Sequence, residues 1–207
     1  AKNSQRLLRL VNQLLDFQLL NSGERGIDLR PVDLVSFVQT CSEYFVYSCG
    51  PKNISFKATV EGQLLGDYRS ESHDCPIFIL SEVDALEKVI FNLLSNALKF
   101  TPENGEIELS VEKVEGSILL NVKDTGPGIE ENHLESIFDS FSQIDDSETR
   151  SYEGAGLGLA YAKSLTEAMH GQIGVQSIPG LGSRFWISFP ICEEPETAAA
   201  NPFKVKD

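Results

Sequence analysis

Residues 81–100 read SEVDALEKVIFNLLSNALKF, and the spacing of side chains in this stretch decides which fold the chain can adopt. Apolar residues recur at helical spacing and form one face, which consists of Leu86, Val89, Ile90, Leu93, Leu94 and Ala97. Asn92, Asn96 and Lys99 lie within about 60° of one another on the opposite arc, at roughly 100° per residue. The stretch is therefore predicted to be an amphipathic helix with a buried face and a polar stripe.

Both ends of this helix carry boundary signals. Ser81 and Asp84 have the spacing of a capping box at its start. Thr101-Pro102 ends the helix at about Phe100, because proline disfavours the helical conformation in the residue before it.

Strands and helices are interspersed irregularly around this helix. Strands are predicted at residues 27–29, 54–60, 77–80, 106–114, 117–123, 172–177 and 183–189, and further helices at residues 31–49 and 157–169. Residues 61–76 are polar and are interpreted as a hairpin or loop insertion. The expected fold class is α+β: a two-layer α/β sandwich in which a mixed sheet has helices on one face.

The first twenty residues contain a wide apolar stripe at helical spacing, and Asn21-Ser22-Gly23 follows as a stop. So wide a stripe needs more than one covering surface, which favours a helical bundle or a dimer. The alternative is that this helix docks only on the domain that follows. We therefore predict one bundle helix at residues 1–22, one domain at residues 27–191, and a linker-like tail at residues 192–207.

Composition excludes several classes of function. The 207 residues include 31 acidic and 17 basic side chains, for a formal charge of −14, and such a field repels nucleic acids and anionic membranes. No segment approaches the roughly 20 apolar residues of a membrane span. Four scattered cysteines show neither a disulfide framework nor zinc-ligand spacing, so a cytoplasmic location with reduced thiols is expected.

Three polar motifs have both an ordinary and a functional interpretation. The stripe of Asn92, Asn96 and Lys99 is either a solvated helix face or a site for a hard cation and phosphate, since amide oxygens ligate Mg²⁺ and lysine supplies a point charge. The second motif, DTGPG at residues 124–128, is either a plain turn or a carboxylate, Asp124, that accepts a hydrogen bond from an exocyclic amine such as that of adenine.

The third motif is GAGLG at residues 154–158, which opens a helix. Glycines at a helix N-terminus expose backbone N–H groups and form a phosphate site, but glycines also occur wherever helices pack closely. The spacing and context of a dinucleotide fingerprint or a P-loop are absent.

Taken in order, four segments resemble the ATP-binding catalytic domain of bacterial sensor histidine kinases: FNLLSNALKFTPENGEI, NVKDTGPGIEE, IFDSFSQID and YEGAGLGLAYAKSLTEAMHGQIGVQSIPGLGSRFWISFP. The resemblance covers the chain to about Pro190. It extends to the wider superfamily of gyrase, Hsp90-type chaperones and MutL, whose Bergerat-type fold is an α/β sandwich. The resemblance implies ATP and Mg²⁺ as ligands and transfer of the γ-phosphoryl group to a histidine.

The resemblance also implies a role for each motif residue. Asn92 and Asn96 match the N box, with Asn96 as the main Mg²⁺ ligand, and Asn92 stands where ATP-hydrolysing relatives have a glutamate. Lys99 matches the phosphate-binding lysine, and Phe100 lies beside the nucleotide. The remaining implied nucleotide-binding residues are Asp124, Gly126, Gly128, Arg150, Gly154, Gly156, Leu157, Gly158 and Ser183.

Other segments match further parts of the family pattern. Phe138 and Phe141 resemble the F box, or are simply core aromatics that anchor a loop. Residues 129–153 resemble the ATP lid, and the turn that contains Gly180 and Gly182 resembles the final glycine turn.

The first helix resembles the second helix of the family's dimerisation and phosphoacceptor hairpin. The helix that carries the acceptor histidine is missing, and His73, His133 and His170 have no acceptor context; His170 is interpreted as a helix C-cap. The implied partners are this hairpin, a second copy in a full-length homodimer, and a response regulator receiver domain. No self-phosphorylation of this chain is expected.

Three alternatives remain at this stage. A serine-type protein kinase of the same fold would share the nucleotide site, but the bundle-like first helix argues against it. An ATPase would be expected to carry a glutamate at position 92. A non-catalytic, nucleotide-gated interaction module would retain the fold without the transfer reaction.

Overall fold

The computed structural model describes residues 11, 14–20, 22–65, 76–142 and 156–193. Its elements follow in chain order: β1 (Arg30–Asp33), α2 (Leu34–Cys49), the 3-10 turn η1 (Gly50–Lys52), β2 (Ser55–Val60), β3 (Gln63–Leu64), β4 (Phe78–Ser81), α3 (Val83–Phe100), β5 (Glu106–Val114), β6 (Ser117–Asp124), the 3-10 turns η2 (Glu131–His133) and η3 (Ser136–Phe138), α4 (Gly158–Ala168), β7 (Gln172–Ile178) and β8 (Gly182–Cys192).

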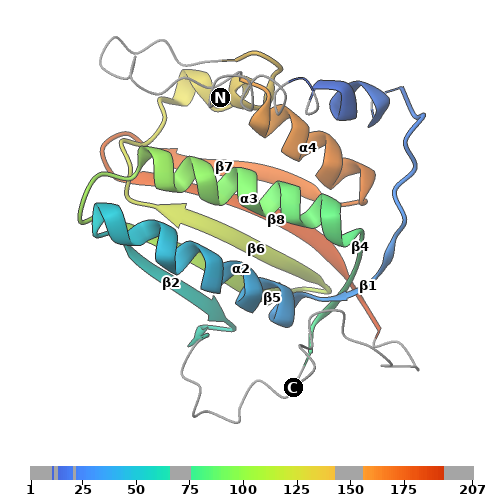
Figure 1. Cartoon of the computed structure of the whole chain (residues 1–207), viewed down its shortest axis with the longest axis horizontal. Coiled ribbons are helices and arrows are strands. Elements are labelled where there is room, and N and C mark those ends of the chain that lie inside the picture. Colours follow the sequence, from blue (N-terminus) through green and yellow to red (C-terminus); the bar gives the residue numbers. More distant parts are fainter. Residues whose placement is uncertain (1–10, 12–13, 21, 66–75, 143–155, 194–207) are drawn as a thin grey trace.

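One eight-stranded sheet runs in the order β1-β4-β8-β6-β5-β2-β3, and β7 pairs with β8 on the side opposite β6. The β2–β5 pair is parallel and the other pairs are antiparallel, so the sheet is mixed. Helices α2, α3 and α4 lie together on one face of this sheet (Figure 1). The predicted α+β two-layer sandwich is confirmed.

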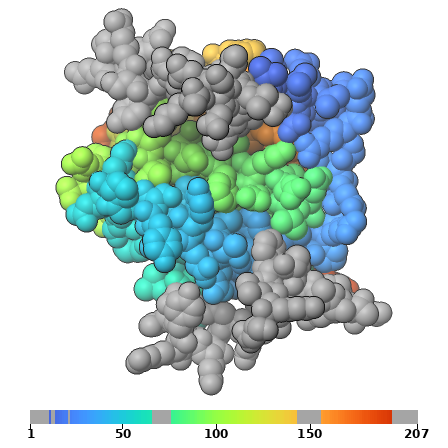
Figure 2. Space-filling model, viewed as in Figure 1, coloured from blue at the N-terminus to red at the C-terminus, as the bar shows by residue number. Residues whose placement is uncertain are grey.

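Helix α3 occupies the middle of the helical layer, and its predicted apolar face is fully buried. Leu86, Val89, Ile90, Leu93 and Leu94 are all 0% exposed. Burial of each such side chain contributes roughly 1.5–3 kcal/mol, so this face fixes the rotation of α3 about its axis. In the space-filling view the outer surface of α2 lies beside that of α3 (Figure 2).

Short polar interactions cap the flanking helices. Asp33 caps α2, because its Oδ1 accepts a hydrogen bond from the Val35 N–H at 3.1 Å. After α4, His170 adopts a left-handed φ of 60°. Its N–H donates to Glu167 O at 3.0 Å, and the Gly171 N–H donates to Thr166 O at 2.9 Å, which together form a Schellman motif. His170 therefore has the predicted capping role.

Three boundary predictions are wrong. The helix expected from residue 31 begins at Leu34, because the three residues before it pair with β4 as part of β1. The strand expected at residues 27–29 lies instead at β1, where Arg30 pairs with Ser81 and Pro31 with Leu80. Pro31 is tolerated because β1 is an edge strand. The capping box at Ser81 does not form: Ser81 belongs to β4, and its hydroxyl donates to Met169 Sδ at 3.0 Å.

The first helix docks on the sandwich with one side only. Phe17 and Leu20 pack against the core, whereas Val11, Leu15 and Leu19 are 44%, 55% and 43% exposed. These three residues are spaced by four, so they form an uncovered apolar stripe along the helix. In the part of the chain that the structure describes, no helix combines the length and apolarity that crossing a membrane requires.

Candidate functional site

The polar stripe of α3 faces the glycine-rich start of α4. Asn92, Asn96 and Lys99 are all partly buried on the C-terminal half of α3. The Asn92 Nδ2 donates to Lys88 O at 2.9 Å, which directs the amide oxygen away from its own helix backbone. A Cβ atom on Gly158 would lie only 2.8 Å from that oxygen. The structure thus brings the first and third sequence motifs into contact.

Asp124 ends β6 at the centre of the sheet and is only 5% exposed. Its Oδ1 accepts a hydrogen bond from the Gly126 N–H at 2.8 Å. Burial raises the pKa of the Asp124 carboxyl, and hydrogen bonds from the Gly126 and Ser183 backbone oppose that rise. A buried carboxylate that accepts only fixed backbone donors is poised to accept a further N–H donor from a ligand.

The loop after Asp124 packs against the end of α3. A Cβ atom on Gly126 would lie 3.2 Å from Phe100 O, so the loop backbone touches the last turn of the helix. Lys99 Nζ lies 4.6 Å from the centroid of the Phe100 ring, and Phe100 is 39% exposed. The first and second motifs therefore also meet, with an aromatic ring and an ammonium group at their junction.

Two further glycines allow the DTGPG loop and the turn between β7 and β8 to approach each other closely near Asp124. Gly128 has a φ of +74°, and a Cβ atom there would lie 2.2 Å from Ile178 O. Gly182 has a φ of +112°, and its Cβ would lie 2.0 Å from Asp124 O. Side chains are excluded at both positions on conformational and steric grounds. These glycines join the DTGPG loop to the turn between β7 and β8.

Ser183 and Ser177 complete this junction. The Ser177 Oγ lies 3.0 Å from the Ser183 Oγ and 2.8 Å from Gly182 O, and it accepts the Ile129 N–H at 2.8 Å. Ser183 is 7% exposed and stands opposite Asp124 in the β6–β8 register. The β6–β8 pairing thus places Ser183 next to Asp124, a proximity that the sequence did not predict.

The segment before α4 has a left-handed residue and a buried anchor. Gly156 has a φ of +67°, and its carbonyl accepts the Phe141 N–H at 2.9 Å. Leu157 is 5% exposed and precedes Gly158, the first residue of α4. The positive end of the α4 dipole is thereby aimed toward Asn92.

The predicted F box divides into two different environments. Phe138 packs edge-on against Phe185, with ring centroids 6.4 Å apart, and joins the core. Phe141 is 66% exposed and has a φ of +66°, so only Phe138 is a core anchor. Arg150, Gly154 and His73 lie outside the described residues.

The chemistry of these groups fits Mg-ATP. Two amide oxygens and an ammonium group lie on one helix, a buried carboxylate ends the central strand, and glycine backbones allow close approach. No group of three or more His, Cys, Asp or Glu side chains within the described ranges could hold a metal.

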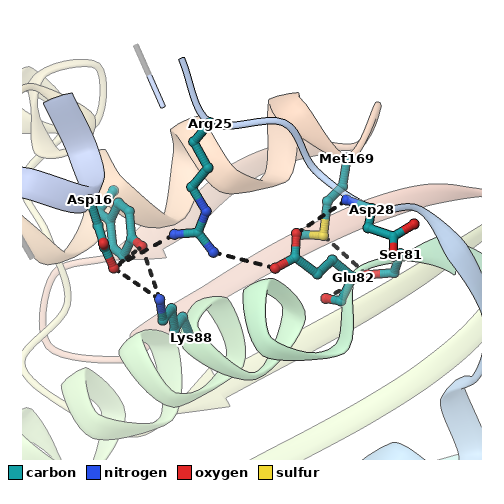
Figure 3. Close-up of polar contacts among 8 residues, drawn as sticks. Asp16, Arg25, Asp28, Ser81, Glu82, Lys88 and Met169 are labelled. Atoms are coloured by element: carbon teal, nitrogen blue, oxygen red, sulfur yellow. Dashed lines mark hydrogen bonds and ion pairs between the residues drawn. The ribbon is translucent and has the colours of Figure 1, made fainter. Parts of the chain in front are cut away.

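A polar cluster that the sequence interpretation missed joins the first helix to α3 and α4 (Figure 3). The Asp16 Oδ2 is 3.0 Å from Lys88 Nζ and accepts the Tyr161 hydroxyl at 3.3 Å. Arg25 lies 3.6 Å from the same oxygen and 3.3 Å from Glu82 Oε1. We call this group of side chains the docking cluster: Asp16, Arg25, Glu82, Lys88 and Tyr161.

Charge pairing in the docking cluster overcomes partial burial. Burial disfavours the ionised form of Asp16, but the hydrogen bond and charge of Lys88, with help from Arg25, lower its pKa. Burial likewise opposes the charge of Lys88, and its hydrogen bond to Asp16 raises its pKa. Phe17 adds an edge-on contact to Tyr161, with centroids 6.4 Å apart. The one feature of the sequence that could have indicated this cluster is Lys88, which lies one helical turn before Asn92 on α3.

The fold and the site together define a nucleotide-binding sandwich of the kind that uses an asparagine-bearing helix. Residues 81–193, more than half of the 207, match the family described as histidine kinase-, DNA gyrase B-, and HSP90-like ATPase. The chain belongs to this family. Within it, the chain corresponds to the catalytic domain of sensor histidine kinases, as its relatives show.

Two curated relatives illustrate this similarity. The chain is 37% identical over 212 residues to the autoinducer 2 sensor kinase/phosphatase LuxQ of Vibrio vulnificus. This alignment covers 98% of the chain and 23% of that protein. It is 33% identical over 205 residues to the sensor histidine kinase GacS of Pseudomonas protegens. This alignment covers 97% of the chain and 21% of that protein. The chain thus spans less than a quarter of either relative.

A solved structure extends the likeness to three dimensions. The full-length ShkA crystal structure, which is in complex with AMPPNP, superimposes with a TM-score of 0.76 and 32% identity. The match covers 96% of this chain and 38% of that one. A mycobacterial sensor histidine kinase, MprB, shares the fold with a TM-score of 0.63 over 79% of this chain.

Asp124→Asn is expected to separate stability from binding. Because burial raises the pKa of Asp124 in the folded state, its ionisation destabilises the fold above that pKa and has no cost below the ordinary value of 3.8. The free energy of unfolding of the variant should therefore exceed that of the parent at pH 7, by a margin that shrinks toward pH 4. Affinity for ATP should fall about 10- to 100-fold, as for a lost hydrogen bond to a charged group.

Urea unfolding between pH 4 and 8 and calorimetric titration with ATP measure these two effects. Asp84→Asn, at an exposed position in the first turn of α3, is the matched control and should leave affinity unchanged. Unchanged affinity in Asp124→Asn, or a lower stability at pH 7, would contradict the assignment of Asp124.

A double-mutant cycle on Asp16→Asn and Lys88→Met tests the docking cluster. We expect a coupling free energy of about 0.5–1 kcal/mol at neutral pH, since both side chains are more than a third exposed. Because the pKa of Asp16 is lowered, the coupling should persist above pH 3.8 and disappear as the pH falls further.

The exposed pair Lys163–Glu167, 4.0 Å apart on α4, provides the control cycle and should give about 0.3 kcal/mol or less. Unfolding curves in urea give all four free energies in each cycle. A coupling for Asp16 and Lys88 no larger than that of the control pair would show that the cluster does not hold the first helix.

Proposed function

We propose that this chain binds Mg-ATP and presents the γ-phosphoryl group to a histidine on a hairpin helix that lies elsewhere in the full-length protein. The observation that carries the proposal is the contact between Asn92 and Gly158, because it joins a polar helix face to a helix N-terminus within reach of one ligand. The similarity to ShkA, whose structure contains an ATP analogue, supports it.

Each of the site residues would have a distinct role in binding Mg-ATP. Asp124 would accept the exocyclic amine of adenine, and Phe100 would lie beside the base. Asn96, with help from Asn92, would hold Mg²⁺, which supplies charge neutralisation at the phosphates. Lys99 and the backbone from Gly156 to Gly158 would receive the phosphates. Arg150 and Gly154, outside the described residues, are proposed as further phosphate contacts.

Catalysis would rest on positioning and electrostatics. In-line transfer to an imidazole needs an aligned γ-phosphoryl group and neutralised charge, and it needs no base that activates water. Asn92 is neutral and its Nδ2 is already engaged by Lys88 O, so it cannot act as such a base. This distinguishes the proposed kinase from a hydrolase of the same family.

The proposed partners follow from the first helix. Its exposed stripe of Val11, Leu15 and Leu19 would pack in a bundle with the missing hairpin helix and with a second copy of the protein. A receiver domain of a response regulator would then accept the phosphoryl group from the histidine. We place the domain in the cytoplasm, where ATP is available and where Cys41 and Cys49 remain free thiols.

Transfer of label from γ-labelled ATP tests this proposal. The chain alone should acquire no acid-labile label, because it lacks an acceptor histidine. Addition of the hairpin segment of the same full-length protein, produced separately, should yield acid-labile label on the hairpin. Asn96→Ala should abolish that transfer, and a hairpin with the acceptor histidine replaced by alanine is the control.

Two outcomes would contradict the proposal. Acid-labile label on the chain alone would show that it carries its own acceptor. Steady release of phosphate without label on the hairpin would instead identify an ATPase.

A further inference from the structure

The last turn of α3 lacks a backbone donor that an α-helix normally provides. Inside an α-helix the N–H of residue i+4 satisfies each carbonyl, whereas at the C-terminal end the donors must come from beyond the helix. After α3, position 102 is a proline, which has no N–H. The carbonyl of Leu98 is the one that loses its partner. The carbonyl of Ala97 retains its own, because the Thr101 N–H donates to it at 2.8 Å.

Lys52 supplies the missing donor from a distant part of the sequence. Its Nζ donates to Leu98 O at 2.8 Å, to Lys99 O at 3.1 Å and to Thr101 O at 3.1 Å. All three ammonium protons are therefore used on the end of one helix. A cation at this end also interacts favourably with the helix dipole.

The turn that carries Lys52 is itself fixed to the segment after α3. The Asn104 N–H donates to Lys52 O at 3.1 Å, and Asn53 Nδ2 donates to Asn104 Oδ1 at 2.7 Å. The Ser55 N–H donates to Gly105 O at 2.9 Å. Lys52 is thus held from its own backbone, and its partly buried side chain spans a short, defined gap.

The helix end that Lys52 closes is the end that carries the proposed ligand-binding side chains. Lys99 and Phe100 are the last two residues of α3, and Phe100 O lies against Gly126 of the DTGPG loop. Without a cap, carbonyls at a helix end turn to water and the last turn frays. Movement of that turn would displace both side chains together.

We propose that Lys52 is a positioning residue of the nucleotide site, which fixes Lys99 and Phe100 by closing the C-terminal end of α3. The inference rests on the proposed function only for its effect on ATP. Lys52 lies outside residues 81–193, the part of the chain that matches the family. It touches no ligand itself, and its role is exerted through the α3 backbone.

Lys52→Met, which keeps the apolar stem and removes the ammonium, tests the inference in the whole chain. We expect affinity for Mg-ATP to fall about tenfold, because a small displacement of positioned groups has large effects on ligand interactions. Lys52→Arg retains donors and charge and should recover affinity to within about threefold of the parent. The exposed Lys57, paired with Glu106 at 3.8 Å, gives the control Lys57→Met, which removes the same unit charge and should change affinity less than about twofold.

Amide hydrogen exchange without nucleotide provides a second readout that does not depend on ATP. Amides at residues 99–101 should exchange at least about tenfold faster in Lys52→Met, while those at residues 90–94 in the middle of α3 should keep the parent's rates. A purely global loss of stability would accelerate both sets together. Lys52→Arg should restore slow exchange at residues 99–101.

The inference is overturned if Lys52→Met and Lys57→Met bind Mg-ATP equally, if Lys52→Arg recovers nothing, or if exchange at residues 99–101 is unchanged. An inability of the parent itself to bind Mg-ATP would contradict the proposed function instead. In that case the exchange rates in the nucleotide-free protein still decide whether Lys52 holds the end of α3.

Discussion

The close approach of glycine backbone to α3 is the constraint on which the site depends. Burial of the apolar face of α3 sets the rotation of the helix about its axis, so that its polar stripe turns away from the core. Gly126 then meets the helix at Phe100 O, and Gly158 meets it at Asn92 Oδ1. A side chain at either glycine would separate motifs that are far apart in the sequence, and the polar stripe would revert to an ordinary solvated face.

The same constraint reconciles an acidic protein with a polyanionic ligand. A formal charge of −14 repels phosphates at long range, so binding requires local compensation. In the proposed function, Mg²⁺, Lys99 at the end of α3, the N-terminus of α4 and Arg150 would supply this positive potential. Lys52, through its hold on the α3 carbonyls, contributes to the order of this region rather than to direct contact.

The sequence predicted the elements with strong periodicity and missed what depends on long-range contacts. The apolar face of α3, the long hairpin of β5 and β6, and the His170 cap follow local rules, and the structure confirms them. The predicted capping role of Ser81 did not form, because Ser81 pairs with β1 as the last residue of strand β4. The docking cluster and the Lys52 cap were not predicted, since their central contacts, Asp16–Lys88 and Lys52–Leu98, join residues more than 40 positions apart.

Magnesium-dependent binding of ATP at one site is the central property that we expect of this domain. Calorimetric titration of the chain with ATP, in excess Mg²⁺ and again in excess chelator, measures this most directly. We predict one binding event per chain that weakens at least about tenfold without Mg²⁺, because neutral amide oxygens alone cannot offset the phosphate charge. Equal affinity in the two titrations would contradict the assignment of the α3 stripe as the metal and phosphate face.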